Sequence, residues 1–152
     1  MMKKRRMVKV YRFIAIKHFY NLAGYLLPIL AVFVLILGTY GSIGGLYLAP
    51  ADYQQGDAFR IIYVHVPSAF LSLFIYLVMA MAAVIGLIFR IKLADLIVSG
   101  SVFLGSWFTF LALLTGSVWA KPMWGAWWVW DARLTSELIL LFLYLGVIAL
   151  RS

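Results

Sequence analysis

Four long apolar runs, separated by short polar stretches, dominate the pattern along this chain. The runs lie at residues 23–44, within 61–89, at 96–119 and at 134–150. A membrane-spanning helix needs roughly 17 to 25 mostly apolar residues, because each residue advances the helix by about 1.5 Å. The last run reaches that length only by including Glu137. The pattern predicts an all-α integral membrane protein with four transmembrane helices and two outward-facing loops, the second carrying a Trp-rich interfacial segment.

Composition supports lipid as the solvent. Of the 152 residues, 66% are hydrophobic and 12% are charged, which is more apolar surface than a soluble domain of this size buries. The absence of Cys excludes disulfides, thiolate metal sites, iron–sulfur clusters and Cys nucleophiles. We divide the chain into a cytoplasmic basic N-terminus, residues 1–22, and a transmembrane domain, residues 23–152.

The distribution of basic residues predicts the orientation. Seven of the thirteen precede the first apolar run, which favours a topology signal over binding of nucleic acid. A cytoplasmic N-terminus places ten basic residues inside and leaves only Arg60, Lys121 and Arg133 outside. The loops at 47–60 and 120–133 therefore face outward.

The second outer loop is rich in tryptophan. Five of the six Trp residues of the chain lie between 119 and 130, namely Trp119, Trp124, Trp127, Trp128 and Trp130. Trp commonly anchors helices at the lipid headgroups, which is one explanation. If the segment is helical, however, Trp124, Trp127, Trp128 and Asp131 share one face. That face would be a flat apolar platform ending in a carboxylate, suited to a planar ligand or a partner.

The residues after this platform have the pattern of a helix start. Asp131 is suited to be the N-cap, Glu137 favours the positive end of the helix dipole, and Arg133 and Glu137 are spaced as an ion pair. Capping alone also accounts for these residues.

His65 is the only histidine expected on the outer side, about one turn inside the second span. An ionisable group at this depth is costly, and imidazole is a common ligand for haem iron. A neutral histidine that is hydrogen-bonded between helices is the alternative.

The segment WGAWWVWDARLTSEL, residues 124–138, resembles the WWD domain of the cytochrome c assembly proteins. The closest resemblance is to the haem exporter family of the cytochrome c maturation system. Segments 49–56, 60–67, 116–117 and 121–123 resemble the same family.

This resemblance implies a non-enzymatic protein of the bacterial inner membrane that binds haem b on its periplasmic surface. The family passes haem to a periplasmic haem chaperone, with an ABC-type transporter and a small single-span accessory protein as partners. By position, His65 is an axial ligand of the haem iron. The platform and chaperone-facing surface correspond to Trp119, Trp124, Trp127, Trp128, Trp130 and Asp131. The haem propionates need cationic partners, for which Arg133 is favoured over Arg60 and Lys121.

The family has six spans, and its second axial histidine follows the fifth. This chain ends at Ser152 after the fourth predicted span, so we expect it to be truncated. Met123 and Tyr63 are chemically able to replace the missing ligand, although no sequence pattern favours either. Two alternatives to a haem carrier are a scaffold that recruits the chaperone or transporter without binding haem, and a non-functional gene fragment.

Overall fold

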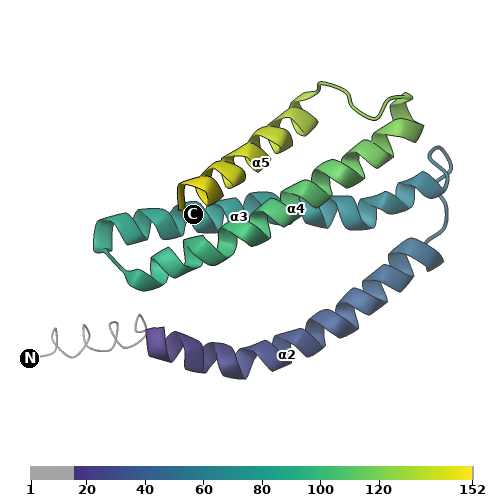
Figure 1. Ribbon diagram of the computed structural model, residues 1–152. Coiled ribbons are helices and arrows are strands. Elements are labelled where there is room, and N and C mark those ends of the chain that lie inside the picture. Colours follow the sequence, from purple (N-terminus) through teal and green to yellow (C-terminus); the bar gives the residue numbers. More distant parts are fainter. Residues whose placement is uncertain (1–15, 152) are drawn as a thin grey trace, which may run out of the picture.

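Helices make up most of the computed structural model, which describes residues 16–151 (Figure 1). The long helices are α2 (Ile16–Ile43), α3 (Ile62–Phe89), α4 (Lys92–Trp124) and α5 (Ala132–Arg151). A π-helical turn, η1 (Gly44–Leu48), and a 3-10 turn, η2 (Asp57–Ile61), lie between α2 and α3. Within the described residues, four helical segments are long and apolar enough to cross a membrane. The predicted all-α membrane fold is confirmed.

The helices extend beyond the predicted apolar runs. α2 begins at Ile16 and includes Lys17, whereas most of the predicted basic N-terminus lies outside the described residues. α4 continues through Pro122, which the sequence placed in a loop. It ends where Gly125 adopts a φ of 74° and donates its N–H to the carbonyl oxygen of Lys121 at 3.0 Å. A left-handed glycine is a common way to end a helix, because it has no Cβ to clash.

The helices α3, α4 and α5 pack into a bundle. α3 and α4 form a tight hairpin through Arg90 and Ile91, and Arg90 has a φ of 53°. The core of the bundle is formed by Met79, Ala82, Val98, Val102, Leu140 and Tyr144. A Cβ at Gly105 would overlap the fully buried ring of Tyr144, so α4 needs glycine where α5 approaches it.

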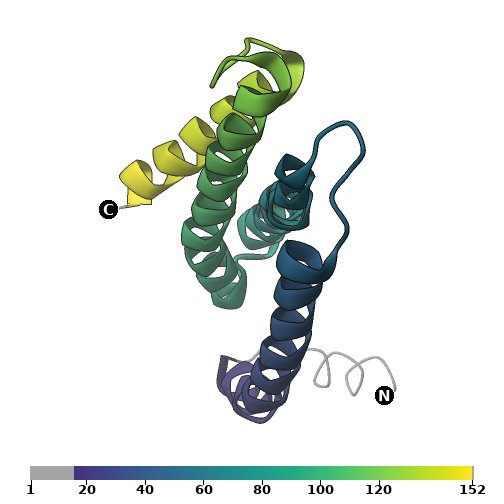
Figure 2. The same cartoon turned by 90° about the vertical axis from the view of Figure 1, so that its right-hand side faces the viewer.

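The helix α2 lies on the side of the bundle away from α5 (Figures 1 and 2). None of its side chains is buried within the chain, as expected of a helix that faces lipid. The turn η1 that follows α2 is tied to η2 by Arg60, which donates to the carbonyl oxygens of Leu46 at 3.1 Å and Ala49 at 3.0 Å.

Candidate functional site

A cavity of about 300 Å³ lies at the end of the bundle where α3 begins and α4 ends. It is lined by Gln55, His65, Gly116, Trp119, Ala120, Met123, Trp124, Asp131, Arg133 and Leu134. Both predicted outer loops and three helices contribute to it. The fold thus places His65 beside part of the Trp-rich segment, although the two are far apart in the sequence.

The position of His65 is fixed by α4. Its Nδ1 atom lies 3.0 Å from the carbonyl oxygen of Ala112 and 3.0 Å from Oγ1 of Thr115. A carbonyl oxygen only accepts, so Nδ1 carries the hydrogen and donates it. The Thr115 hydroxyl donates to the Leu111 carbonyl oxygen at 2.6 Å, which leaves Oγ1 able to accept from His65. The lone pair of a neutral ring is then on Nε2, the arrangement typical of metal-binding histidines.

Gly116 and Trp119 form the α4 wall beside His65. A Cβ at Gly116 would lie 3.1 Å from Cε1 of His65 and 3.2 Å from Cδ2 of Leu134, so glycine makes room for the imidazole. The Trp119 ring meets the His65 ring edge to face at 5.8 Å between centroids. The Trp119 N–H donates to Oε1 of Gln55 at 3.0 Å, which joins this wall to the first loop.

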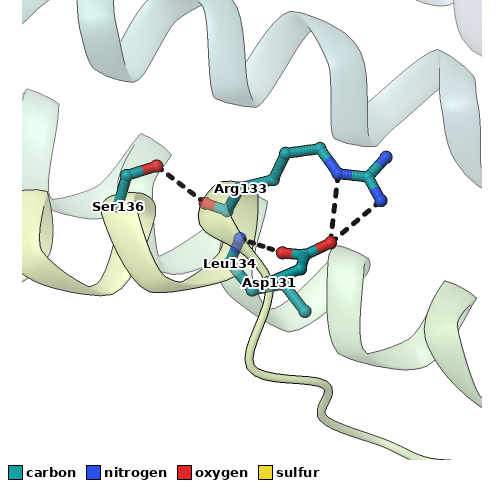
Figure 3. Close-up of polar contacts among 4 residues, drawn as sticks. All are labelled: Asp131, Arg133, Leu134 and Ser136. Atoms are coloured by element: carbon teal, nitrogen blue, oxygen red, sulfur yellow. Dashed lines mark hydrogen bonds and ion pairs between the residues drawn. The ribbon is translucent and has the colours of Figure 1, made fainter.

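Asp131 caps α5 and holds Arg133 (Figure 3). Its Oδ1 atom accepts the backbone N–H of Leu134 at 2.8 Å, which confirms the predicted N-cap. Its Oδ2 atom accepts from Nε and Nη2 of Arg133 at 3.1 and 2.9 Å. The Leu134 N–H and then the Arg133 guanidinium lower the pKa of Asp131 below its usual range, against the opposing effect of desolvation.

The predicted ion pair between Arg133 and Glu137 is wrong. The Arg133 guanidinium pairs with Asp131 and lies 5.5 Å from the centroid of the Trp124 ring. Glu137 is directed into the bundle instead, where its Oε1 atom lies 2.7 Å from Oγ of Ser72 on α3. The contacts between helices therefore prevail over the local spacing.

The predicted tryptophan face depended on a helical segment, and that helix does not form. Gly125 ends α4, and residues 128–131 are not helical. Trp119 and Trp124 line the cavity, whereas Trp127 and Trp130 lie outside it, with 58% and 75% of their surface exposed. Trp128 is partly buried and packs edge to face with Trp130 at 5.3 Å. Trp119 and Trp124 therefore form a cavity pair, Trp127 and Trp130 form an exposed pair, and Trp128 belongs to neither.

The cationic candidates occupy different places. Arg133 lines the cavity, but Arg60 and Lys121 do not. Besides its two carbonyl partners, Arg60 lies 3.3 Å from Asp57. The Lys121 ammonium donates to the Gly125 carbonyl oxygen at 2.9 Å and lies 5.9 Å from the centroid of the Trp127 ring.

Five residues that line the cavity were not assigned to the site from sequence, namely Gln55, Gly116, Ala120, Met123 and Leu134. Gln55 lies in the segment 49–56, and the resemblance of that segment to the family was the only sequence feature that pointed to Gln55. Met123, considered only as a substitute ligand, reaches the cavity because α4 extends beyond its predicted end. Tyr63 lies elsewhere, packed over Gly45. Among residues 16–151, no group of three or more His, Asp and Glu side chains is arranged to hold a metal ion.

Comparison with known proteins gives consistent matches. The family profile described as Heme exporter protein C matches residues 9–152. Heme exporter protein C of Escherichia coli K12 is 58% identical over 131 residues, which cover 86% of this chain and 54% of that protein. The protein of the same name from Haemophilus influenzae is 55% identical over 133 residues, covering 88% and 54%. A putative cytochrome c biosynthesis ccmC-like mitochondrial protein of Marchantia polymorpha is 49% identical over 116 residues, covering 76% and 50%. The chain spans about half the length of these relatives.

Proposed function

This chain belongs to the Heme exporter protein C family, and from that premise we propose that it binds haem at the cavity and presents it to a periplasmic haem chaperone. The haem, as haem b, is a cargo that is delivered for the assembly of c-type cytochromes. The names of the relatives, which are those of an exporter, support this role.

The observation that carries the proposal is the orientation of His65 in the cavity. Its Nδ1–H is held by Ala112, so Nε2 is the atom available to bind iron. Trp119 and Trp124 provide aromatic surface for the flat apolar faces of the porphyrin. The donor set and the aromatic walls therefore fit haem.

The size of the cavity supports a shallow mode of binding. About 300 Å³ is at the lower end of the range for small-molecule sites, so the cavity takes only part of a porphyrin. Trp124 is 50% exposed, and the remainder of the haem would emerge beside it. Incomplete enclosure suits a carrier that must release its cargo.

Arg133 is the propionate partner that we propose. Asp131 orients its guanidinium through Nε and Nη2, which leaves Nη1 free of that ion pair. A propionate would form a charge-assisted hydrogen bond there. Arg60 and Lys121 are less suited, because both are engaged outside the cavity.

The exposed pair, Trp127 and Trp130, is the surface that we propose for the chaperone. Large aromatic side chains that are exposed next to a ligand site are common anchors of protein interfaces. Through the family we also propose an ABC-type transporter and a small single-span protein as partners.

The membrane orientation that we propose places the cavity on the periplasmic side of the inner membrane. At the opposite end of the bundle, Arg90, Lys92 and Arg151 gather around a second cavity. Basic residues favour the cytoplasmic side, which supports this orientation.

A direct test combines haem loading and transfer. The purified chain in lipid nanodiscs is titrated with haem and then mixed with the purified, haem-free chaperone. We expect saturable binding with the spectrum of histidine-ligated haem, followed by its decay as the chaperone acquires haem. Association with the chaperone without any haem binding would contradict the carrier role and would favour a scaffold.

A further inference from the structure

A polar cluster of the buried Ser72 and Tyr144 and the partly buried Glu137 links α3 to α5. Oγ of Ser72 on α3 lies 2.7 Å from Oε1 of Glu137 on α5. The hydroxyl of Tyr144, two turns further along α5, donates to the backbone carbonyl oxygen of Ser72 at 2.8 Å. Ser72 and Tyr144 are fully buried. Two residues of α5 therefore bind the same residue of α3.

The Ser72 hydroxyl has two close oxygen neighbours but only one hydrogen. Its Oγ lies 2.7 Å from the carbonyl oxygen of Ala69 as well as 2.7 Å from Glu137. The carbonyl oxygen only accepts, so a hydrogen bond to Ala69 uses the single hydroxyl hydrogen of Ser72. The contact with Glu137 is then a full hydrogen bond only if the Glu137 carboxyl carries a proton and donates to Oγ.

The surroundings of Glu137 favour the neutral acid. Arg133, the cation on its own helix, pairs with Asp131, and no ion pair involving Glu137 occurs among the described residues. α3 contributes Ser72 and, against Tyr144, the ring of Tyr76. An unpaired carboxylate among such groups within a membrane-spanning bundle is costly.

The cluster is placed to set the position of one cavity wall. α5 carries Arg133 and Leu134 on that wall and Asp131 caps it, while His65 lies on α3. The main packing partner of α5 is α4, and the cluster adds a direct bond from α5 to α3. Movement of α5 relative to Ser72 would displace Arg133 relative to His65.

We propose that Glu137 is a positioning residue: a neutral carboxylic acid that fastens α5 to Ser72 and holds the Arg133 wall of the cavity in place relative to His65. Its effect on haem rests on the proposed function. The protonation state and the helix position do not, so they are measured without haem.

Infrared spectroscopy of the purified chain tests the protonation state. We expect the carbonyl stretch of a protonated carboxylic acid at neutral pH, lost in Glu137→Gln and shifted in Ser72→Ala. Loss of the band in Glu137→Gln assigns it to Glu137, because that variant keeps all four aspartates of the chain. Absence of this band would overturn the proposal.

Spin labels test the position of α5. The chain has no Cys, so labels at Val66→Cys on α3 and Ile139→Cys on α5, both exposed, report only this distance. We expect Ser72→Ala and Tyr144→Phe each to broaden the distance distribution, since each removes one bond. Glu137→Gln, which still donates to Oγ, should leave it narrow. If the distance distributions of all variants equalled that of the unsubstituted chain, the proposal that these bonds hold α5 in place would be refuted.

Haem titration then tests whether the bonds between α5 and Ser72 affect the affinity for haem. Loss of one such bond in a membrane protein predicts about three- to tenfold weaker haem binding for Ser72→Ala, with Glu137→Gln close to the original chain. Unchanged affinity of Ser72→Ala would contradict the positioning role. If neither the unsubstituted chain nor any variant bound haem, the proposed function would be refuted. The infrared and distance measurements would then test by themselves whether Glu137 and Tyr144 hold α5 against Ser72.

Discussion

The Nδ1 atom of His65 on α3 lies 3.0 Å from the backbone carbonyl oxygen of Ala112 on α4. This contact gives Nδ1 the hydrogen and leaves Nε2 with the lone pair that a metal needs. Because the acceptor is a backbone atom, side-chain substitution at Ala112 does not remove it. Substitution of the neighbouring residues Thr115 and Gly116 can instead change the hydrogen bonding and the position of the His65 ring.

Thr115→Val is expected to weaken haem binding by roughly tenfold, the lower end of the usual effect of an outer partner, because it removes one of the two acceptors of His65 Nδ1 and leaves Ala112. The measurement is a haem titration of the purified chain. The matched control is Thr109→Val, since Thr109 also lies on α4 and also donates to a carbonyl oxygen one turn earlier. Equal affinities of the two variants would show that Thr115 has no role in ligation.

Gly116→Val is expected to displace the His65 ring, because the first added carbon already lies 3.1 Å from Cε1. The haem absorption spectrum should lose its histidine-ligated form. Gly100→Val, on the same helix where a Cβ meets nothing within 4 Å, controls for the effect of valine on the helix. A histidine-ligated spectrum in Gly116→Val would contradict the described packing.

The bonds of Asp131 predict a difference in Tm between the original chain and Asp131→Asn, and this difference depends on pH. Bonds from Leu134 and Arg133 lower the pKa of Asp131, so they stabilise the folded chain above the ordinary Asp value of about 3.9. This stabilisation is lost as the pH falls through the lower value of the folded state. Asp131→Asn keeps the cap but loses the ion pair with Arg133. Its Tm should be below that of the original chain at pH 6, and the gap should narrow below about pH 4.

A gap in Tm that stays constant across this pH range would contradict the role given to the Asp131 carboxylate. Asp131→Ala extends the comparison, because it loses both the cap and the ion pair. It should have the lowest Tm of the three chains at pH 6.

Replacing Trp127 and Trp130 with Ala is expected to slow haem transfer to the chaperone while leaving haem binding within about twofold, because both side chains lie outside the cavity. Trp107→Ala removes a tryptophan that is 64% exposed in the middle of α4, and it serves as the control for membrane insertion. Normal transfer by the double variant would exclude the exposed pair as the docking surface.

The sequence predicted the helices well because apolar length is the main requirement for crossing a membrane. It placed their ends less accurately, since hydropathy marks the lipid-facing part of a helix and not its caps. α4 passes Lys121 and Pro122 and stops at Gly125, where the left-handed glycine, and not the change of polarity, ends it.

The candidate site was only partly predictable. His65 stood out as the only histidine expected on the outer side. The acceptors of its N–H lie on another helix, 47 and 50 residues away, where no local spacing points to them. The expected pair of Arg133 and Glu137 failed for the same reason. Its spacing was correct for a lone helix, yet Asp131 and Ser72 provide partners that only the fold brings near.

The most direct test of the haem-binding role is the amount of haem bound by the purified chain and by His65→Ala, measured by absorbance at equal protein concentration. His18→Ala, the substitution of the only other histidine, is the matched control. The iron ligand itself is lost in His65→Ala, so its affinity should fall by more than the roughly tenfold expected for an outer partner, while His18→Ala should bind as the original chain does. Unchanged haem absorbance in His65→Ala would contradict the assignment of His65 as the iron ligand.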